Sequence, residues 1–118
     1  MLAKVNRLPS YELRKTLQSG KRINFPQVSF IYKPNGNQAS RFGFVVGTNI
    51  DKRAVVRNRL KRRLRESIRL LLPKIKTGFD VIILARKGLI DMTMFRVKEL
   101  TQTILRKAGL FNHETMRQ

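Results

Sequence analysis

An apolar stripe runs through the most basic part of the sequence. Between positions 52 and 65 the chain reads KRAVVRNRLKRRLR, in which eight of fourteen residues are Lys or Arg and none is acidic. On a helix, where successive residues are about 100° apart, one side of this region and its continuation is apolar. That side consists of Val56, Leu60, Leu64, Ile68 and Leu71. Such a helix is stable only where the rest of the fold covers its apolar side, and we expect a sheet to cover it.

The opposite side of the same helix concentrates cations of like sign. Arg57 and Lys61, Lys61 and Arg65, and Arg59 and Arg63 are each four residues apart. Each such pair costs about as much as an opposite-charge pair gains, roughly 0.2–0.5 kcal/mol. A solvated surface helix is the plain alternative, but such helices usually alternate their charges. A locally unfavourable arrangement indicates a functional site, and the planar guanidinium group suits phosphate.

The overall charge indicates a polyanionic partner. The 118 residues include 26 Lys and Arg against 7 Asp and Glu, a net charge of +19. This charge opposes compaction unless a polyanion neutralises it, and nucleic acid is the common one. An anionic membrane surface is a weaker candidate. The 42% apolar content is enough for a core, and residues 1–118 are expected to form a single domain.

The absence of cysteine excludes disulfides and thiolate metal sites. We see no secretory signal near the N-terminus, and the longest apolar run, 81–85, is too short to span a bilayer. We therefore expect a cytoplasmic protein that does not act in a membrane.

The remaining segments predict the order α-β-β-α-β-α, an α+β sandwich on a small sheet. Asn35-Gly36 is the strongest hairpin signal and is expected to join the first two strands. The expected strands are 28–32, 41–47 and 79–86, the last buried on both faces. The expected helices begin at the N-caps Ser10, Asp51 and Asp91 and end at Gly20, about Leu72 and Gly109. Residues 111–118 are expected to form a frayed tail.

Aromatic residues on two strands offer a possible stacking surface. Phe30 and Tyr32 share one face of the first strand, and Phe42 and Phe44 share one face of the next. Exposed aromatics on a sheet stack on unpaired bases. The core is the better interpretation for Phe42 and Phe44, while both interpretations stay open for Phe30 and Tyr32.

The chain lacks the grouped carboxylates or paired histidines that a protein nuclease needs. Asp51 and Asp91 fall at expected helix starts, and Asp80 begins a strand. His113, the single histidine, lies in the expected tail. We therefore predict no catalytic residue and no metal ligand in the chain itself.

The segment AVVRNRLKRRLRE, 54–66, resembles the signature of the protein subunit of bacterial ribonuclease P. Arg57-Asn58-Arg59, followed by Lys61-Arg62 and Arg65, matches it position by position. The flanking segments RLPSYELRKTLQSGKR, RFGFVVG and FDVIILARKG are also similar to that family, in the right order. The resemblance covers approximately residues 7–110.

The resemblance implies a fold and a function. The fold would be the ribosomal protein S5 domain 2-like fold, a small mixed sheet with a left-handed β-α-β crossover. The chain would be the protein subunit of a ribonucleoprotein that removes the 5′ leader from precursor tRNA. The partners would be the ribonuclease P RNA and precursor tRNA, with no protein partner implied. Mg²⁺, held mainly by the RNA, would do the chemistry with it, and the chain alone would bind none tightly.

The resemblance also implies two sets of binding residues. The leader would lie against the sheet, in a cleft between the first helix and the edge of the second. The leader-binding residues would be Phe30, Tyr32, Leu13 and Leu17. The residues facing the ribonuclease P RNA would be Lys52, Arg53, Arg57, Asn58, Arg59, Lys61, Arg62 and Arg65.

The chain departs from the family at two places. Leu13 and Leu17 stand where the family often has aromatics, and Thr48-Asn49 stands where it commonly has a Lys pair. Two other functions fit the charge: a ribosomal or other structural RNA-binding protein, and a module that binds duplex DNA.

Overall fold

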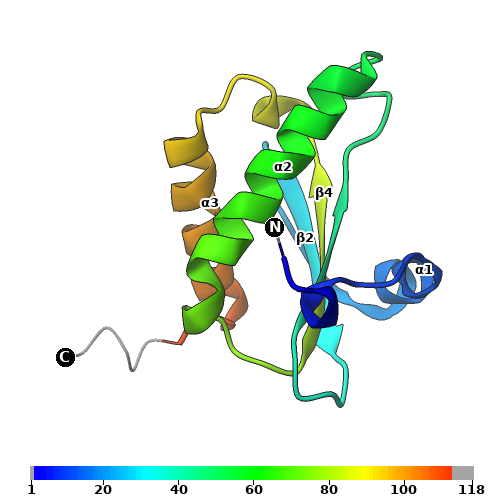
Figure 1. The fold of residues 1–118 in the computed structure, drawn as a ribbon, viewed down its shortest axis with the longest axis vertical. Coiled ribbons are helices and arrows are strands. Elements are labelled where there is room, and N and C mark those ends of the chain that lie inside the picture. The colour runs from blue at the N-terminus through cyan, green and yellow to red at the C-terminus, as the bar shows by residue number, and fades with distance from the viewer. Residues whose placement is uncertain (1, 113–118) are drawn as a thin grey trace.

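Three helices and a four-stranded sheet make up residues 2–112, the part of the chain that the computed structural model describes. Helices α2 and α3 lie on one face of the sheet and α1 lies on the other (Figure 1). No helix in this part is long and apolar enough to cross a membrane. The elements are α1 Ser10–Ser19, β1 Lys21–Asn24, β2 Val28–Pro34, β3 Arg41–Val45, α2 Ala54–Leu71, β4 Phe79–Ala85 and α3 Met94–Ala108, with short 3-10 turns at Lys4–Asn6, Leu72–Lys74 and Lys87–Leu89.

The strand order is β1-β2-β4-β3, so the expected hairpin between β2 and β3 is wrong. β4 lies between them, antiparallel to β2 and parallel to β3, and α2 connects the two parallel strands. β4 takes the central place because both of its faces are apolar: Val81, Ile82 and Ile83 are each at most 3% exposed. The Asn35-Gly36 turn does form, with Gly36 at φ 73°. The strand that follows it, β3, does not pair with β2, because β4 lies between the two strands.

The strand β1 was not predicted. It is four residues long, carries Lys21 and Arg22, and pairs with β2 at one edge of the sheet. Its exposed, mostly polar residues give no apolar alternation that a sequence pattern could detect. Charged side chains are a common way of protecting an edge strand from pairing with another chain.

The apolar stripe of α2 is buried as predicted, and it forms the centre of the larger core. Each of its five side chains is at most 7% exposed. They pack with the sheet residues Phe30 and Phe42 and with the α3 residues Val97 and Ile104. A buried polar contact also joins the two helices, where the hydroxyls of Ser67 and Thr101 lie 3.0 Å apart.

The predicted N-caps are wrong by one or two residues. The residues at the N-cap positions of the three helices are Pro9, Arg53 and Thr93. Thr93 displaces Asp91 because its own hydroxyl accepts a hydrogen bond from the amide of Arg96 at 3.2 Å. Gly109 ends α3 in the left-handed conformation, as predicted.

The predicted tail begins too early. Phe111 is 1% exposed in the core, and its backbone forms a bridge with Ile75. The amide of Asn112 donates to the carbonyl of Lys74 at 2.6 Å. Residues 113–118, including His113, lie outside the described residues.

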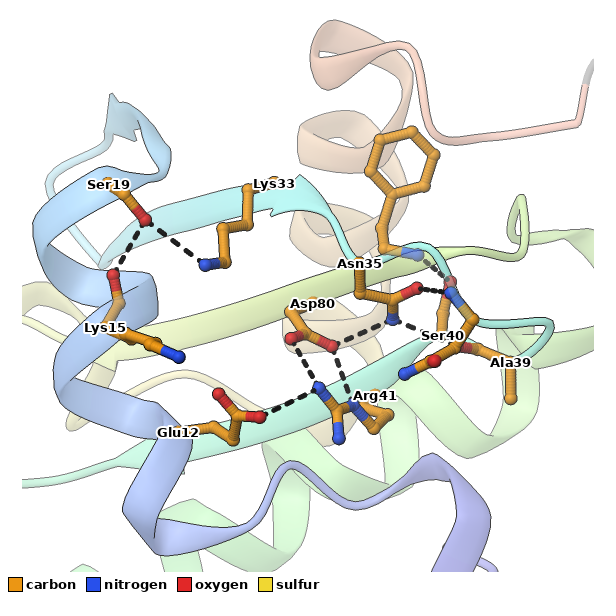
Figure 2. Close-up of polar contacts among 11 residues, drawn as sticks. Glu12, Lys15, Ser19, Lys33, Asn35, Ala39, Ser40, Arg41 and Asp80 are labelled. Atoms are coloured by element: carbon orange, nitrogen blue, oxygen red, sulfur yellow. Dashed lines mark hydrogen bonds and ion pairs between the residues drawn. The ribbon is translucent and has the colours of Figure 1, made fainter.

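Helix α1 covers the other face of the sheet with a much smaller apolar cluster. Leu8, Ile31 and Ile82 are its buried members, and Leu13 of α1 packs against them. A polar network supplements this contact (Figure 2). Arg41 on β3 donates two hydrogen bonds of 2.8 Å to the carboxylate of Asp80 on β4.

The network around Asp80 joins three elements of the fold, α1, β3 and β4, to the turn that follows β2. The side-chain amide of Asn35 donates to Asp80 at 2.9 Å, and Glu12 of α1 lies 3.7 Å from the guanidinium of Arg41 (Figure 2). Burial by itself would raise the pKa of Asp80, but the hydrogen bonds from Arg41 and Asn35 outweigh it and lower the pKa. The carboxylate is therefore bound in its charged form.

We expect Asp80→Asn to lower the free energy of unfolding by about 2–3 kcal/mol at pH 7, because it removes the hydrogen-bonded counter-charge of the partly buried Arg41 and leaves only Glu12, at 3.7 Å. The native pKa is below the unfolded value of about 3.9, so this stabilisation is present above the unfolded pKa. It is lost as the pH falls through the native pKa. Urea unfolding should therefore show a difference between wild type and variant that shrinks from pH 7 to pH 3.

The exposed Asp91 provides the matched control. Asp91→Asn should change stability by less than about 0.5 kcal/mol. A difference between wild type and Asp80→Asn that stays constant down to pH 3 would show that the charge of Asp80 does not stabilise the fold.

Candidate nucleic-acid interface

One side of α2 presents polar side chains that the rest of the fold leaves unpaired. Among residues 2–112, none of them takes part in an ion pair or a side-chain hydrogen bond. Four are cations, and the burial of the opposite side of the helix fixes their direction. We call this set the cationic face: Asn58, Arg59, Lys61, Arg62 and Arg65.

Arg65 is the member of the cationic face that the fold positions most directly. Its guanidinium carbon lies 5.8 Å from the centre of the Phe44 ring on β3. A cation over an aromatic face is attracted by the ring without losing its charge. Arg65 is thus held at the edge of α2 that faces β3.

Two arginines predicted to face a nucleic acid also form hydrogen bonds with the loop before α2. Arg57 donates from Nη1 to the carbonyl oxygens of Asp51 at 3.0 Å and Lys52 at 2.8 Å. Arg53 donates from its backbone amide and its guanidinium to the carboxylate of Asp51, at 2.9–3.0 Å. The side-chain hydrogen bonds from Arg53 are the main reason that the pKa of Asp51 falls to about 2.

Arg57 therefore has a structural role, since it fastens residues 51–52 to the first turn of α2, and its contact with a nucleic acid stays a prediction. Arg53 and Lys52 remain exposed on that loop. The structure brings together five of the eight predicted residues on the cationic face, and it places the other three at the start of the helix.

A hollow of about 210 Å³ lies between α1, β3 and α2, where the sequence analysis placed a cleft. We call it the α1–α2 hollow. Ser10 and Leu13 of α1 line it opposite Lys61 and Arg65 of α2, with Gly43 of β3 between them. Its remaining lining residues are Leu2, Arg7, Leu8, Phe42 and Phe44.

The four residues predicted to bind a leader are not brought together. Leu13 lines the α1–α2 hollow, and Leu17, 39% exposed, follows it one turn later on α1. Phe30 is 0% exposed, so its predicted role as a contact residue is wrong. Tyr32 is half-buried beside it, with ring centres 5.7 Å apart.

The error for Phe30 comes from the choice of face, not from the alternation along the strand. Phe30 and Tyr32 do share a face, but α2 and α3 cover that face, whereas α1 lies over Ile31. The periodicity of a strand cannot show which helix covers which side.

A second hollow, of about 500 Å³, contains cations that the sequence analysis missed. Ser29, Val45 and Leu84 line it from the α1 side of the sheet, and Arg86 and Lys87 line it just after β4. We call it the β4-end hollow. A signal for it existed, because two cations directly follow a strand that is apolar on both faces. Its other lining residues are Pro26, Gly47, Asn49, Ile50 and Ala85.

Comparisons with known proteins agree over most of the chain. The model of the Ribonuclease P family matches residues 2–109. The ribonuclease P protein component of Symbiobacterium thermophilum is 36% identical over 91 residues, 77% of this chain and 78% of that protein. That of Caldanaerobacter subterraneus subsp. tengcongensis is 35% identical over 103 residues, 87% of this chain and 88% of that protein.

Solved structures are similar as well. The RNase P protein from Thermotoga maritima has a TM-score of 0.79 and 28% identity, over 86% of this chain and 96% of that one. The RNase P protein of Staphylococcus aureus has a TM-score of 0.82 and 25% identity, over 92% of this chain and 100% of that one. The mixed sheet with three helices is thus a fold that these proteins share.

We expect Arg57→Ala to loosen the loop before α2, because two carbonyl oxygens lose their donor. The amide of Arg53 should exchange with deuterium faster, and the free energy of unfolding should fall by about 1 kcal/mol. Arg59→Ala, two residues later on the cationic face, is the matched control. It should change neither the exchange rate of the Arg53 amide nor the free energy of unfolding. Equal exchange at Arg53 in wild type and Arg57→Ala would mean that Arg57 does not hold the loop.

Proposed function

The chain belongs to the ribonuclease P protein family and is the protein subunit of that ribonucleoprotein, in which we propose that the cationic face of α2 binds the ribonuclease P RNA. The particle removes the 5′ leader from precursor tRNA. The observation that carries the proposal is the fixed placement of Asn58, Arg59, Lys61, Arg62 and Arg65 on a helix whose other side is buried.

The arrangement suits a phosphate backbone for a physical reason. Cations on a segment that becomes helical only on binding would bring the cost of ordering its backbone, roughly 1–2 kcal/mol per residue. Here the helix is already fixed, and Arg65 is held over the Phe44 ring. Phosphate contacts release counterions and supply affinity that does not depend on sequence.

We place the single-stranded leader on the α1 side of the sheet. The α1–α2 hollow offers the apolar Leu13 opposite the cations Lys61 and Arg65. The β4-end hollow offers Arg86 and Lys87 beside an apolar floor on the same face. An extended strand of unpaired nucleotides needs this combination of apolar surface for bases and cations for phosphates.

Leucine supplies less of the stacking than an aromatic residue would. Leu13 and Leu17 can contact a base or a sugar through dispersion, but they lack a ring face. We therefore assign more of the leader affinity to the cations of the two hollows than to α1.

We assign Mg²⁺ to the partner RNA, because residues 2–112 contain no group of three or more carboxylate or histidine side chains that could hold a metal ion. Asp51, Glu66 and Asp80 each accept hydrogen bonds from an arginine. A carboxylate that accepts hydrogen bonds from a guanidinium group already has a counter-charge, so it is less available as a metal ligand. A metal ion held by the RNA would supply activation of the attacking water, while this chain would bind and position the RNA.

Reconstitution tests the proposed function. We expect the purified chain, added to a bacterial ribonuclease P RNA at low Mg²⁺, to increase the rate of precursor tRNA cleavage. It should also raise affinity more for precursor tRNA than for mature tRNA. A structural RNA-binding protein would not increase the rate of precursor tRNA cleavage. A duplex-DNA-binding module would bind double-stranded DNA as tightly as precursor tRNA. Either result would contradict the proposal.

Salt dependence tests the cationic face. We expect Arg59→Ala and Arg62→Ala each to weaken binding to the ribonuclease P RNA and to reduce the log–log salt slope by about one, the loss of one phosphate contact. Arg22→Ala, an exposed cation on β1 at the opposite edge of the sheet from β3, is the matched control. A slope that changes as much for Arg22→Ala would show that the effect reflects net charge and not the cationic face.

A further inference from the structure

A third hollow, of about 430 Å³, lies between α2 and the first turn of α3; it shares Arg65 with the α1–α2 hollow and no residue with the β4-end hollow. We call it the α2–α3 hollow. It shares Arg59, Arg62 and Arg65 with the cationic face, so it is continuous with that face. Arg63, Glu66 and Met94 complete its lining. Met94, at the start of α3, is its one apolar side chain.

The rim of this hollow carries two cations that no acidic group among residues 2–112 pairs with. Arg63 is held by the carbonyl oxygen of Met92 at 2.8 Å. Glu66 is paired with Arg69, whose guanidinium donates to it at 2.9 Å and lowers its pKa. Among the described residues, Arg59 and Arg62 have neither an ion pair nor a side-chain hydrogen bond. The hollow thus joins an apolar contact to two unengaged guanidinium groups.

We propose that the α2–α3 hollow receives one unpaired nucleotide of the ribonuclease P RNA, whose base contacts Met94 and whose phosphate binds Arg59 or Arg62. This rests on the proposed binding of that RNA to the cationic face. A thioether is polarisable and makes favourable contacts with aromatic rings. Guanidinium planes stack on bases that are splayed out of a helix.

Size and charge favour this occupant. The volume falls within the range of roughly 300–1,000 Å³ that small-molecule sites occupy. A regular duplex would touch only the rim, since its bases are stacked inside and its phosphates are outside. An apolar peptide would bury Arg59 and Arg62 without counter-charge, which is unfavourable. A single nucleotide provides both an aromatic base and an anion.

Thiol footprinting provides a direct test, because the chain contains no cysteine and one introduced thiol is unique. Met94→Cys and Phe95→Cys are labelled with an alkylating reagent, free and in complex with the ribonuclease P RNA. Phe95 is the matched control: it is 68% exposed on the same turn of α3 but does not line the hollow. We expect alkylation to slow at least about fivefold at position 94 and less than about twofold at position 95.

Affinity measurements give a second readout. Met94→Ala should weaken binding of the ribonuclease P RNA by about three- to tenfold, the size of a sulfur–aromatic contact. The salt slope should not change, because no phosphate contact is lost. Phe95→Ala should change the affinity by less than twofold.

Two results would overturn this inference. Alkylation at position 94 that is equally fast in the free protein and the complex would show that the hollow stays open. Protection that arises only when a second protein is added would assign the hollow to a protein partner. In both cases the Arg59 and Arg62 salt slopes still report separately on the proposed RNA-binding face.

Discussion

Burial of the apolar side of α2 is the interaction on which the rest of the structure depends. Each of its five buried side chains contributes roughly 1.5–3 kcal/mol, whereas each like-charged pair on the opposite side costs about 0.2–0.5 kcal/mol. The anchoring term is therefore larger than the repulsion by nearly an order of magnitude. The helix can carry unpaired cations because its attachment to the sheet does not rely on its charges.

The two faces of the sheet are stabilised in different ways. The face under α2 and α3 has a large core that extends to Leu110 and Phe111. The face under α1 has three buried apolar residues and is supplemented by the hydrogen bonds of Arg41 to Asp80. The α1–α2 hollow thus has one wall fixed by apolar packing and one wall whose position depends on a charged pair. Asp80 does not line this hollow, but a substitution there can affect it through Arg41 and Glu12 of α1.

The periodicity of the sequence predicts which segments form helices and strands better than it predicts which strands pair with one another. The stripe from Val56 to Leu71 specifies a helix and its buried side, because five residues agree on one direction. Nothing local specifies that β4 lies between β2 and β3, since Asn35-Gly36 makes the same turn whichever strand follows. The alternation in β2 likewise predicts correctly that Phe30 and Tyr32 share a face. It does not show that α2 and α3 cover this face, because that depends on the path of the whole chain.

The binding residues show a similar division. The pattern Arg57-Asn58-Arg59 predicts an interface on α2, but successive residues of a helix point about 100° apart, so Arg57 and Arg59 point in different directions. Arg57 binds the carbonyl oxygens of Asp51 and Lys52, whereas Arg59 has no hydrogen-bond or ion-pair partner among residues 2–112. Side-chain hydrogen bonds to a preceding loop depend on the path of that loop, which the sequence does not give.

Charge alone does not explain which cations matter. With 26 basic and 7 acidic residues, most cations of this chain must lack an acidic partner wherever they lie. An unpaired arginine is therefore weak evidence for a site, and the evidence comes from rigidity. The cations of α2 are set on a helix whose core side is at most 7% exposed, while Arg22 lies on a four-residue edge strand. For a chain this basic, the partner is distinguished by the fixed spacing of a few cations, not by their total number.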